Sequence, residues 1–279
     1  MSLPLPLLMT PRGTGICWYT AARNDFESSV SGLRPSLFKT TTPPLADTNF
    51  RSVCANTATT ACFAHIRATS GSTVVTTNNH PFVFGRHSFM HNGSVSSFTS
   101  IRRSICDELD LDTYANVLGT TDSEHVAALY ITYLTSGRGK AAWEEEYSAR
   151  DMATALTKAV GFVIAAQTKI LGAARAPNSL NLAATDGKRL VTFRFRNHST
   201  EQPPSLYYST TAGVSLNRKY EGGVNEASNG LKASEHGAHV IVASEPTTYS
   251  EDEWNLIGKN ECVMVETSGA VVVEVIKYE

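Results

Sequence analysis

The sequence contains no run of lysine and arginine, no CxxC pair and no stretch of 18 uninterrupted apolar residues. A formal net charge of −2 over 279 residues gives no electrostatic reason to expect a nucleic-acid partner. The lack of a long apolar run predicts that no segment spans a membrane. The five cysteines are odd in number and scattered, which indicates free thiols in a reducing compartment, so we expect a cytoplasmic protein.

The chain begins MSLPLPLLMTPRG, an apolar segment that prolines interrupt and that no basic residues precede. A signal peptide therefore fits it poorly, and we expect residues 1–12 to be an atypical leader. No tandem repeat or strong linker divides the rest, and a hydrophobic content of 42% is sufficient for a sizeable core. We expect residues 1–279 to form a single domain.

Hydrophobic periodicity predicts mostly strands with two helical blocks. Strands are expected at 14–20, 61–69, 205–211, 239–245, 261–267 and 271–278. Hairpins are expected at 80–93 and at 179–197, the latter turning at Asp186-Gly187. Helices are expected at 96–109, at 122–137 with Asp122 or Ser123 as N-cap, and from 149, the last running into a strand before 167. Residues 218–237 resemble a loop. The pattern favours one α+β domain of stacked sheets.

The stretch FMHNGSVSSF, residues 89–98, ends an apolar run on Asn92 and Gly93. Asn-Gly is typical of a two-residue hairpin turn, because both residues tolerate positive φ. Alternatively, the Asn92 side-chain amide and the Gly93 backbone N–H are two donors that could converge on an oxyanion. The stretch by itself leaves both interpretations open.

Three kinds of polar residue also stand out. Arg67 lies in the apolar strand CFAHIRAT, where burial requires either an internal carboxylate or a ligand carboxylate. Asp122 opens the helix DSEHVAAL, where it is either a simple cap or a ligand-binding carboxylate. The five histidines between positions 65 and 125 match no metal-binding spacing, so we expect neither a metal nor a cofactor.

Four motifs, FAHIRAT, NNHPF, FMHNG and GTTDSEH, occur in this order with a spacing that resembles the glutaminase domain of class II glutamine amidotransferases. These are N-terminal-nucleophile hydrolases, so the resemblance implies a four-layer αββα sandwich of mainly antiparallel sheets. The stretches at 36–44, 179–187, 203–210 and 242–257 resemble one branch in particular. That branch is the stand-alone fungal and bacterial amidotransferase-like proteins, including the subunit of the fungal complex that degrades glutathione.

The resemblance implies a role for each matching residue. Arg67 matches the arginine that binds the α-carboxylate of a glutamine or γ-glutamyl substrate, and Asp122 matches the carboxylate that receives its α-ammonium group. Asn92 and Gly93 match the oxyanion hole, aimed by a sharp turn. The remaining two matches are to the substrate pocket, with His80 in its wall and Thr69 among its binding residues.

The catalytic nucleophile of this family is a cysteine that directly follows the initiator methionine and uses its own α-amino group as base. Here residues 11–19 match a family stretch that lies beyond the nucleophile, so we expect the first strand with its cysteine to be absent. Ser2 would become N-terminal after methionine removal, although the residues after it do not resemble the family's first strand. Cys17, Cys54, Cys62 and Cys106 are internal and are expected to be small buried hydrophobic residues.

Three interpretations of function follow. The first is an amidohydrolase of glutamine or of γ-glutamyl amides such as glutathione, whose start was assigned wrongly or trimmed. The second is a pseudoenzyme that keeps the γ-glutamyl pocket for binding or for holding a partner subunit, by resemblance a metallopeptidase-like one. The third is an unrelated structural sandwich. The first two imply a glutamine or γ-glutamyl peptide ligand, with no nucleic-acid or membrane partner.

Overall fold

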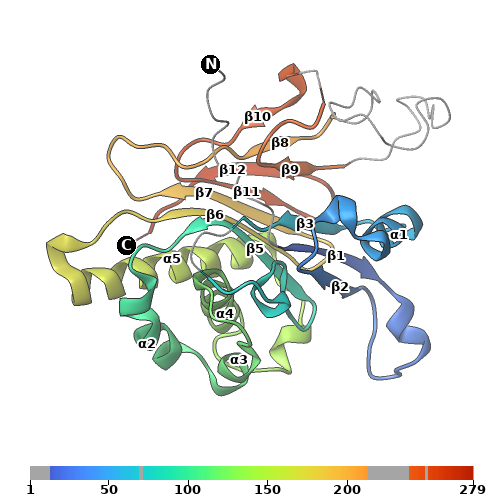
Figure 1. The fold of residues 1–279 in the computed structure, drawn as a ribbon, viewed down its shortest axis with the longest axis horizontal. Coiled ribbons are helices and arrows are strands. Elements are labelled where there is room, and N and C mark those ends of the chain that lie inside the picture. The colour runs from blue at the N-terminus through green and yellow to red at the C-terminus, as the bar shows by residue number, and fades with distance from the viewer. Residues whose placement is uncertain (1–12, 69–71, 213–238, 249–250, 279) are drawn as a thin grey trace, which may run out of the picture.

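The computed structural model describes residues 13–68, 72–212, 239–248 and 251–278, and these form three antiparallel sheets (Figure 1). The six-stranded sheet contains, in spatial order, β12 (Val271–Val275), β11 (Glu261–Val265), β7 (Leu190–Arg196), β6 (Ser179–Thr185), β5 (His87–Ser94) and β4 (Phe82–Phe84). A second sheet contains β2 (Arg34–Thr40), β1 (Thr14–Thr20) and β3 (Cys62–Ile66). A third contains β10 (Asn255–Leu256), β8 (Tyr207–Ser209) and β9 (Ile241–Ala243).

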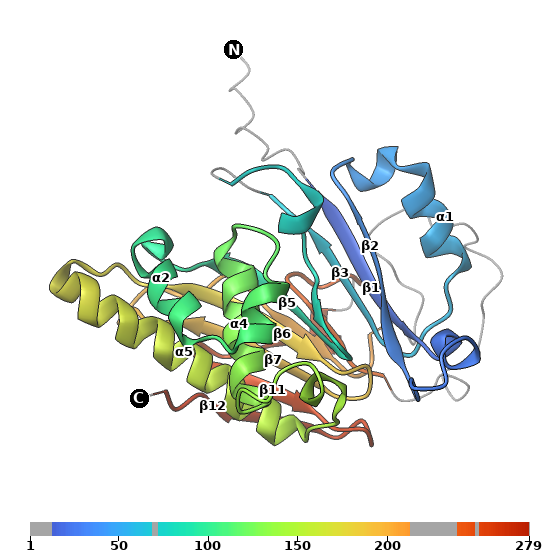
Figure 2. The same cartoon turned by 90° about the horizontal axis from the view of Figure 1, so that it is seen from below.

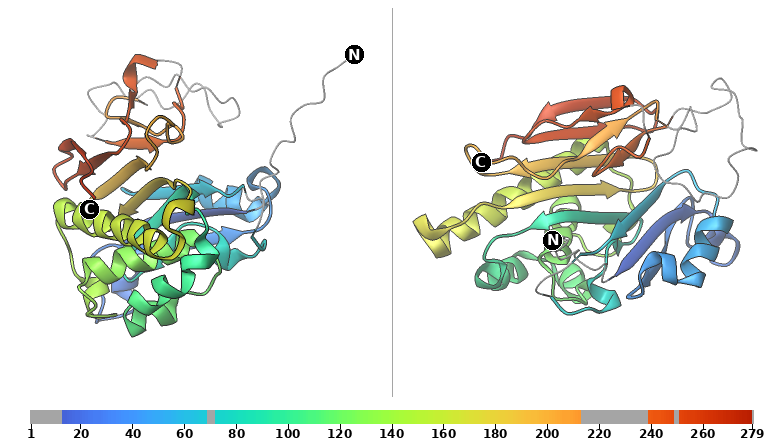
Figure 3. Two further views of the ribbon diagram at one scale, coloured as in Figure 1. Left: turned by 90° about the vertical axis from the view of Figure 1, so that its left-hand side faces the viewer. Right: turned by 45° about the horizontal axis from the view of Figure 1, so that its top comes forward.

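Helices cover the two outer sides of this arrangement (Figure 2). One layer consists of α2 (Phe98–Glu108), α3 (Leu111–Asn116), α4 (Asp122–Leu134) and α5 (Ala149–Leu171). On the opposite side α1 (Thr48–Asn56) packs on the second sheet, where the rings of Phe50 and Phe38 lie 6.1 Å apart. Figure 3 shows the green and yellow helices on one side of the yellow to red strands. The layers run helix, sheet, sheet, helix, as predicted for the αββα sandwich.

The main hydrophobic core lies between the six-stranded sheet and helices α2, α4 and α5. Helix α4 is surrounded by this core, and all but two of its residues are buried. Even the 23-residue α5 is not apolar enough to cross a membrane, nor is any other helix in the described part of the chain.

The prediction that the segment from residue 149 changes from helix to strand is wrong, because α5 is one continuous helix to Leu171. A capping box between Ser148 and Asp151 fixes its start. Its buried positions include Leu156, Val160 and Val163, which follow the helical period and pack on the sheet. This packing outweighs the strand preference of the β-branched residues.

The predicted turn at Asn92-Gly93 is also wrong. Both residues lie inside β5, where Asn92 pairs with Asn181 and Gly93 with Leu180 of β6. The 80–93 hairpin instead turns at Gly85, which has a φ of +54°. Gly93 has a φ of +148°, and a Cβ there would lie 2.0 Å from the Ser179 carbonyl oxygen. Glycine is therefore required for close approach to β6 rather than for a turn.

The other predicted strands and the hairpin at Asp186-Gly187 are confirmed. The strand at 14–20 has the predicted bounds, and the others are shorter than expected. Strand β2 and helices α1 and α3 were not predicted from periodicity. The expected leader at 1–12 and the proposed loop at 218–237 both lie outside the described residues.

A small core of Cys17, Tyr19 and Phe63 joins the second sheet to the six-stranded sheet. The hydroxyl group of Tyr19 is buried and lies 2.9 Å from the Arg86 carbonyl oxygen and 3.0 Å from the Thr185 carbonyl oxygen. It also lies 2.9 Å from the Ser88 hydroxyl. A single side chain thus connects β1 with both strands of the β5–β6 pair and with the turn before them.

Replacing Tyr19 with phenylalanine should lower the free energy of unfolding by about 1–3 kcal/mol, because buried oxygen atoms lose a hydrogen-bond partner while the ring stays in place. Urea denaturation monitored by fluorescence would measure this loss. Tyr114→Phe is the control, since that side chain is 54% exposed. Equal stability of the two variants would show that the inter-sheet bonds contribute nothing.

Candidate functional site

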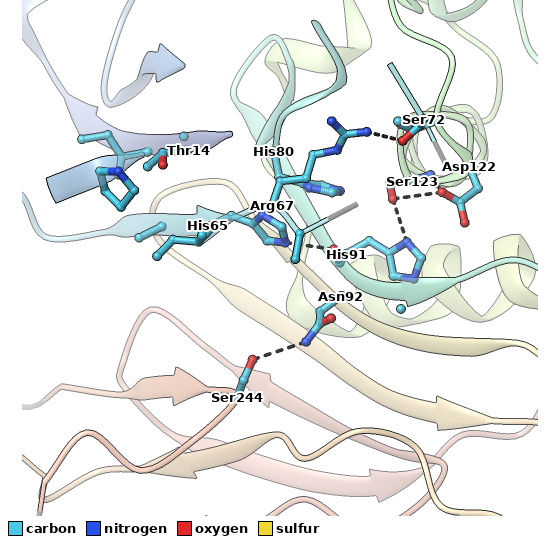
Figure 4. Close-up of a pocket in the computed structure, with 18 of the residues that line it drawn as sticks. Thr14, His65, Arg67, Ser72, His80, His91, Asn92, Asp122, Ser123 and Ser244 are labelled. Atoms are coloured by element: carbon cyan, nitrogen blue, oxygen red, sulfur yellow. Dashed lines mark hydrogen bonds between the residues drawn. The ribbon is translucent and has the colours of Figure 1, made fainter. Parts of the chain in front are cut away.

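A cavity of about 570 Å³ lies where strands β1 and β3 meet the end of β5 and the start of α4 (Figure 4). It is lined by the predicted site residues Arg67, His80, Asn92, Gly93 and Asp122. Thr69, the remaining predicted residue, lies outside the described residues. Residues that come from four separate motifs therefore share one cavity.

Arg67 follows β3 and is only 5% exposed. Its guanidinium donates hydrogen bonds to the Ser72 hydroxyl and, at 3.3 Å, to the Thr73 carbonyl oxygen. No carboxylate among the described residues lies within 4.0 Å of it, so the alternative of an internal ion pair finds no support there. Burial lowers the pKa of Arg67, while the charge of Asp122 raises it. Arg67 is thus a buried cation held by neutral acceptors.

Asp122 is the first residue of α4, and the N-cap of this helix is Thr121. The prediction of Asp122 or Ser123 as N-cap is therefore wrong. The Asp122 carboxylate accepts hydrogen bonds from the backbone N–H of Val95 at 2.7 Å and of Ser123 at 2.8 Å. The positive end of the helix dipole also favours its negative charge. Figure 4 shows the Arg67 guanidinium directed toward Ser72, on the side of the cavity where Asp122 lies.

Three histidines form one wall of the cavity. The rings of His65 and His80 lie 4.1 Å apart, and a His65 ring nitrogen lies 3.2 Å from the His91 carbonyl oxygen. His91 contacts the Ser123 hydroxyl at 2.9 Å. Burial lowers the pKa of all three, that of His65 to about 4, so these rings are neutral at pH 7.

The charges in the cavity are therefore few. Arg67 is the one cation and Asp122 the one carboxylate among the lining residues that the structure describes. Within the described ranges no group of three or more histidine, cysteine, aspartate or glutamate side chains could hold a metal ion.

Asn92 is exposed to the cavity and its side-chain N–H₂ group lies 3.5 Å from the Ser244 hydroxyl, a long contact. Ser244 directly follows β9 and lies 152 residues from Asn92 in the chain. Periodicity and spacing did not single out Ser244, and they gave Ser123 no role beyond that of a candidate helix N-cap. The signal available was their place in motifs, since VASEP contains Ser244 and GTTDSEH contains Ser123.

None of the five cysteines, all of which the structure describes, lines this cavity. Cys17 is fully buried, and burial raises its pKa to about 12. Cys262 is buried as well, and burial raises its pKa to the same value. A thiol with such a pKa is a poor nucleophile at neutral pH. The chemistry that the described cavity offers is recognition of opposite charges and donation of hydrogen bonds.

The fold is that of class II glutamine amidotransferase domains. A glutamine aminotransferase class-II domain protein from Silicibacter pomeroyi superposes with a TM-score of 0.65 at 20% identity, covering 94% of this chain and 91% of that one. A predicted glutamine amidotransferase from Pseudomonas aeruginosa gives 0.50 at 22% identity, covering 98% and 92%. The glutamine phosphoribosylpyrophosphate amidotransferase of B. subtilis gives 0.54 at 10% identity, covering 97% of this chain and 44% of that one.

Sequence comparison agrees with the fold. The chain is 28% identical over 263 residues to probable glutamine amidotransferase DUG3 of Saccharomyces cerevisiae, covering 92% of this chain and 70% of that protein. No family model matches the chain. The resemblance to class II glutamine amidotransferases predicted from the four motifs is confirmed.

The lowered pKa of His65 predicts a pH dependence of stability. The pKa of His65 is 6.5 in the unfolded chain and about 4 in the folded one. Between these two pH values, His65 therefore binds a proton in the unfolded chain but not in the folded chain. The free energy of unfolding should therefore fall as the pH decreases from 6.5 to 4, with His65 contributing on the order of 2 kcal/mol.

Urea denaturation at several pH values would test this, with His65→Gln as the variant. The variant should show a shallower decrease over the same range. His198→Gln is the control, because that side chain lies outside the cavity and is 32% exposed. Parallel profiles for wild type and His65→Gln would contradict the assignment.

Proposed function

We propose that this chain is a class II glutamine amidotransferase-like protein that binds glutamine or a γ-glutamyl amide in the cavity beside Asn92. One observation supports this more than any other: the buried Arg67 has no carboxylate partner in the described chain and shares the cavity with Asp122. An α-amino acid carries one carboxylate and one ammonium group. Arg67 would bind the first as a planar fork and Asp122 the second as an acceptor.

The reaction that this arrangement suits is hydrolysis of the γ-amide. The thiol of an N-terminal cysteine gives its proton to its own α-amine, and the sulfur bonds to the γ-carbonyl carbon. The C–N bond of the amide then breaks, and the nitrogen leaves with the proton from the resulting α-ammonium group. Water then cleaves the thioester to give glutamate and the free thiol. Asn92 Nδ2 and the Gly93 N–H would donate to the oxyanion in both steps, and His80 and Thr69 would support the substrate.

The proposal includes γ-glutamyl peptides such as glutathione, because Arg67 and Asp122 would contact only the α-carboxylate and α-ammonium groups of the ligand. Pro44 and Phe50 also line the cavity, which leaves an apolar wall for the part of the substrate beyond the amide. A single amidotransferase domain over 1–279, a cytoplasmic location and a metallopeptidase-like partner subunit remain predictions from the resemblance.

A second function is favoured by the position of the cysteines. Since none of the five lines the cavity, the chain could act as a pseudoenzyme that binds γ-glutamyl compounds without cleaving them. Both functions require the same head-group recognition. They differ in whether a nucleophile reaches the amide.

A measurement of ligand binding tests the recognition of the amino-acid head group, which both functions require. Replacing Arg67 with lysine should weaken binding of glutamine and glutathione about tenfold or more, because lysine cannot form the planar, two-pronged contact with a carboxylate. Calorimetry on folded protein would measure the dissociation constants. Arg102→Lys is the matched control, because Arg102 lies outside the cavity and bonds to His125. Equal affinities for the two variants would remove Arg67 from the site.

A measurement of hydrolysis tests whether the site cleaves the γ-amide, which distinguishes the two functions. Purified 1–279 should release no glutamate above background, and a form that begins with a cysteine-led strand should release it. In that active form, Asn92→Ala should reduce turnover about 10²–10³-fold with little change in KM, the usual loss for one oxyanion donor. A coupled glutamate assay measures both. Asn116→Ala, an amide outside the cavity, is the control. Full turnover in Asn92→Ala would refute the oxyanion role.

A further inference from the structure

A cavity of about 390 Å³, the β2–β4 cavity, lies between β2 and β4, each of which is an outermost strand of its own sheet. It shares no lining residue with the cavity of the candidate site. The two are neighbours, because the ring of Phe82 in the β2–β4 cavity lies 4.8 Å from the ring of His80 in the other. The β2–β4 cavity is therefore a separate site, and the proposed hydrolysis does not use it.

Lys39 of β2 brings an ammonium group to this cavity. Its Nζ lies 4.9 Å from the centre of the Phe82 ring. The side chain is half-buried, and it forms no hydrogen bond or ion pair with any residue that the structure describes. Burial lowers its pKa to about 8, so the ammonium form still predominates at pH 7. Lys39 is thus a cation without an anionic partner in the described chain.

Glu124 of α4 brings a carboxylate to the same cavity. It is 5% exposed, and it accepts hydrogen bonds from the backbone N–H of Leu118 at 3.0 Å and of Gly119 at 2.6 Å. Burial raises the pKa of Glu124, while these two bonds lower it and so favour the charged form. Each of its oxygens accepts one of the two bonds. A carboxylate oxygen has two acceptor sites, so each can accept a further bond from a ligand.

Lys39 and Glu124 are the only charged side chains among the described residues that line the β2–β4 cavity. The charge of each favours the charged form of the other. They nevertheless do not approach within 4.0 Å of each other, so they form no direct ion pair. A ligand with a single charge would be attracted by one of these groups and repelled by the other. A ligand that carries both charges can satisfy both groups.

The walls of the cavity are mainly apolar. Phe84 lies inside it and is 2% exposed, whereas Leu37 is 44% and Leu118 is 73% exposed. Leu37 and Lys39 share one face of β2, because they are two residues apart in a strand. An apolar group that covers Leu37 and Leu118 removes their surface from water. The volume also falls within the range of about 300–1,000 Å³ that is usual for small-molecule sites.

We propose that the β2–β4 cavity binds a free α-amino acid with an apolar side chain. The ligand carboxylate contacts the Lys39 ammonium, and the ligand ammonium donates to the Glu124 carboxylate. The ligand side chain packs against Leu37 and Leu118. Binding at this site does not depend on the proposed function, because neither Arg67 nor Asp122 lines the cavity.

Calorimetry on the full chain 1–279, with L-leucine as the probe, tests the proposal without altering the protein. Three analogues each lack one recognised part: N-acetyl-leucine lacks the ammonium group, leucinamide lacks the carboxylate, and glycine lacks the apolar side chain. Each analogue should bind about tenfold or more weakly than leucine. The first two each lose a charge-assisted hydrogen bond and leave one protein charge without a partner. Glycine loses the apolar contact.

Variants locate the bound leucine. Lys39→Met keeps a flexible apolar side chain but removes the ammonium group, and it should weaken leucine binding about tenfold or more. Lys39→Arg keeps the charge and should retain binding. Lys158→Met is the matched control, since Lys158 is exposed on α5 and lies outside the cavity. Arg67→Lys alters the candidate site alone and should bind leucine like wild type. Circular dichroism checks that each variant is folded.

The outcomes separate this proposal from the proposed function. Leucine binding that Lys39→Met weakens and Arg67→Lys does not supports the β2–β4 site, even if glutamine and glutathione fail to bind. The absence of leucine binding overturns it, as does equal binding by Lys39→Met and Lys158→Met. Leucine binding that only Arg67→Lys weakens also overturns it, because the ligand would then lie in the candidate site. Equal affinity for leucine and N-acetyl-leucine contradicts the role of Glu124.

Discussion

The hydrogen bond from the Val95 N–H to the Asp122 carboxylate joins the six-stranded sheet to the helix layer at the place where the candidate site lies. Beside it the Ser123 hydroxyl contacts His91, whose other ring nitrogen lies 3.3 Å from the Ser179 carbonyl oxygen. The end of β5, the start of β6 and the first turn of α4 are thus connected through buried polar groups. Since α4 is almost wholly buried, its first turn cannot shift without disturbing the core. This fixes the position of Asp122 relative to Asn92.

The opposite side of the cavity depends on the second sheet. Arg67 leaves β3, and its backbone N–H is tied to Gly13 beside β1. Close approach of the layers is required here, since a Cβ on Gly15 would lie 2.0 Å from the His80 carbonyl oxygen. The charge pair of the site is therefore divided between layers, with the cation on one sheet and the carboxylate on the helix behind the other. The two charges therefore face the same cavity only in the assembled sandwich.

Motif order predicted residues that share one cavity, whereas reasoning from local sequence predicted the turn and the helix N-cap wrongly. Arg67, His80 and Asp122 are far apart in sequence, yet the motifs that contain them led to one cavity. Periodicity and spacing did not single out Ser244, because its contact with Asn92 joins residues that are 152 positions apart in the chain. The N-cap choice failed for a local reason: Thr121 precedes Asp122 and its hydroxyl is equally able to accept from the Glu124 N–H.

The fold was predicted well where periodicity is strong and poorly where tertiary contacts decide. The strand-like residues at the centre of α5 become helical because that helix lies between a sheet and two other helices, where its whole apolar face is buried. The Asn92-Gly93 sequence is typical of a turn, but both residues pair with residues of β6 and are therefore part of a strand. Strand β2 is the edge of a three-stranded sheet and α1 covers that sheet. Both bury little, so their amphipathic patterns are weak.

Burial of the Arg67 charge is energetically unfavourable, and this bears on the proposed function. A guanidinium removed from water and bonded only to neutral oxygens is less stable than one paired with a carboxylate, as its lowered pKa indicates. A mutation that supplied an internal carboxylate would relieve this cost, and it would also neutralise the cation. A ligand carboxylate relieves the same cost only while it is bound. If the proposed ligand binds Arg67 through its carboxylate, its binding stabilises the fold by mass action and couples occupancy of the cavity to the stability of the junction between the two sheets.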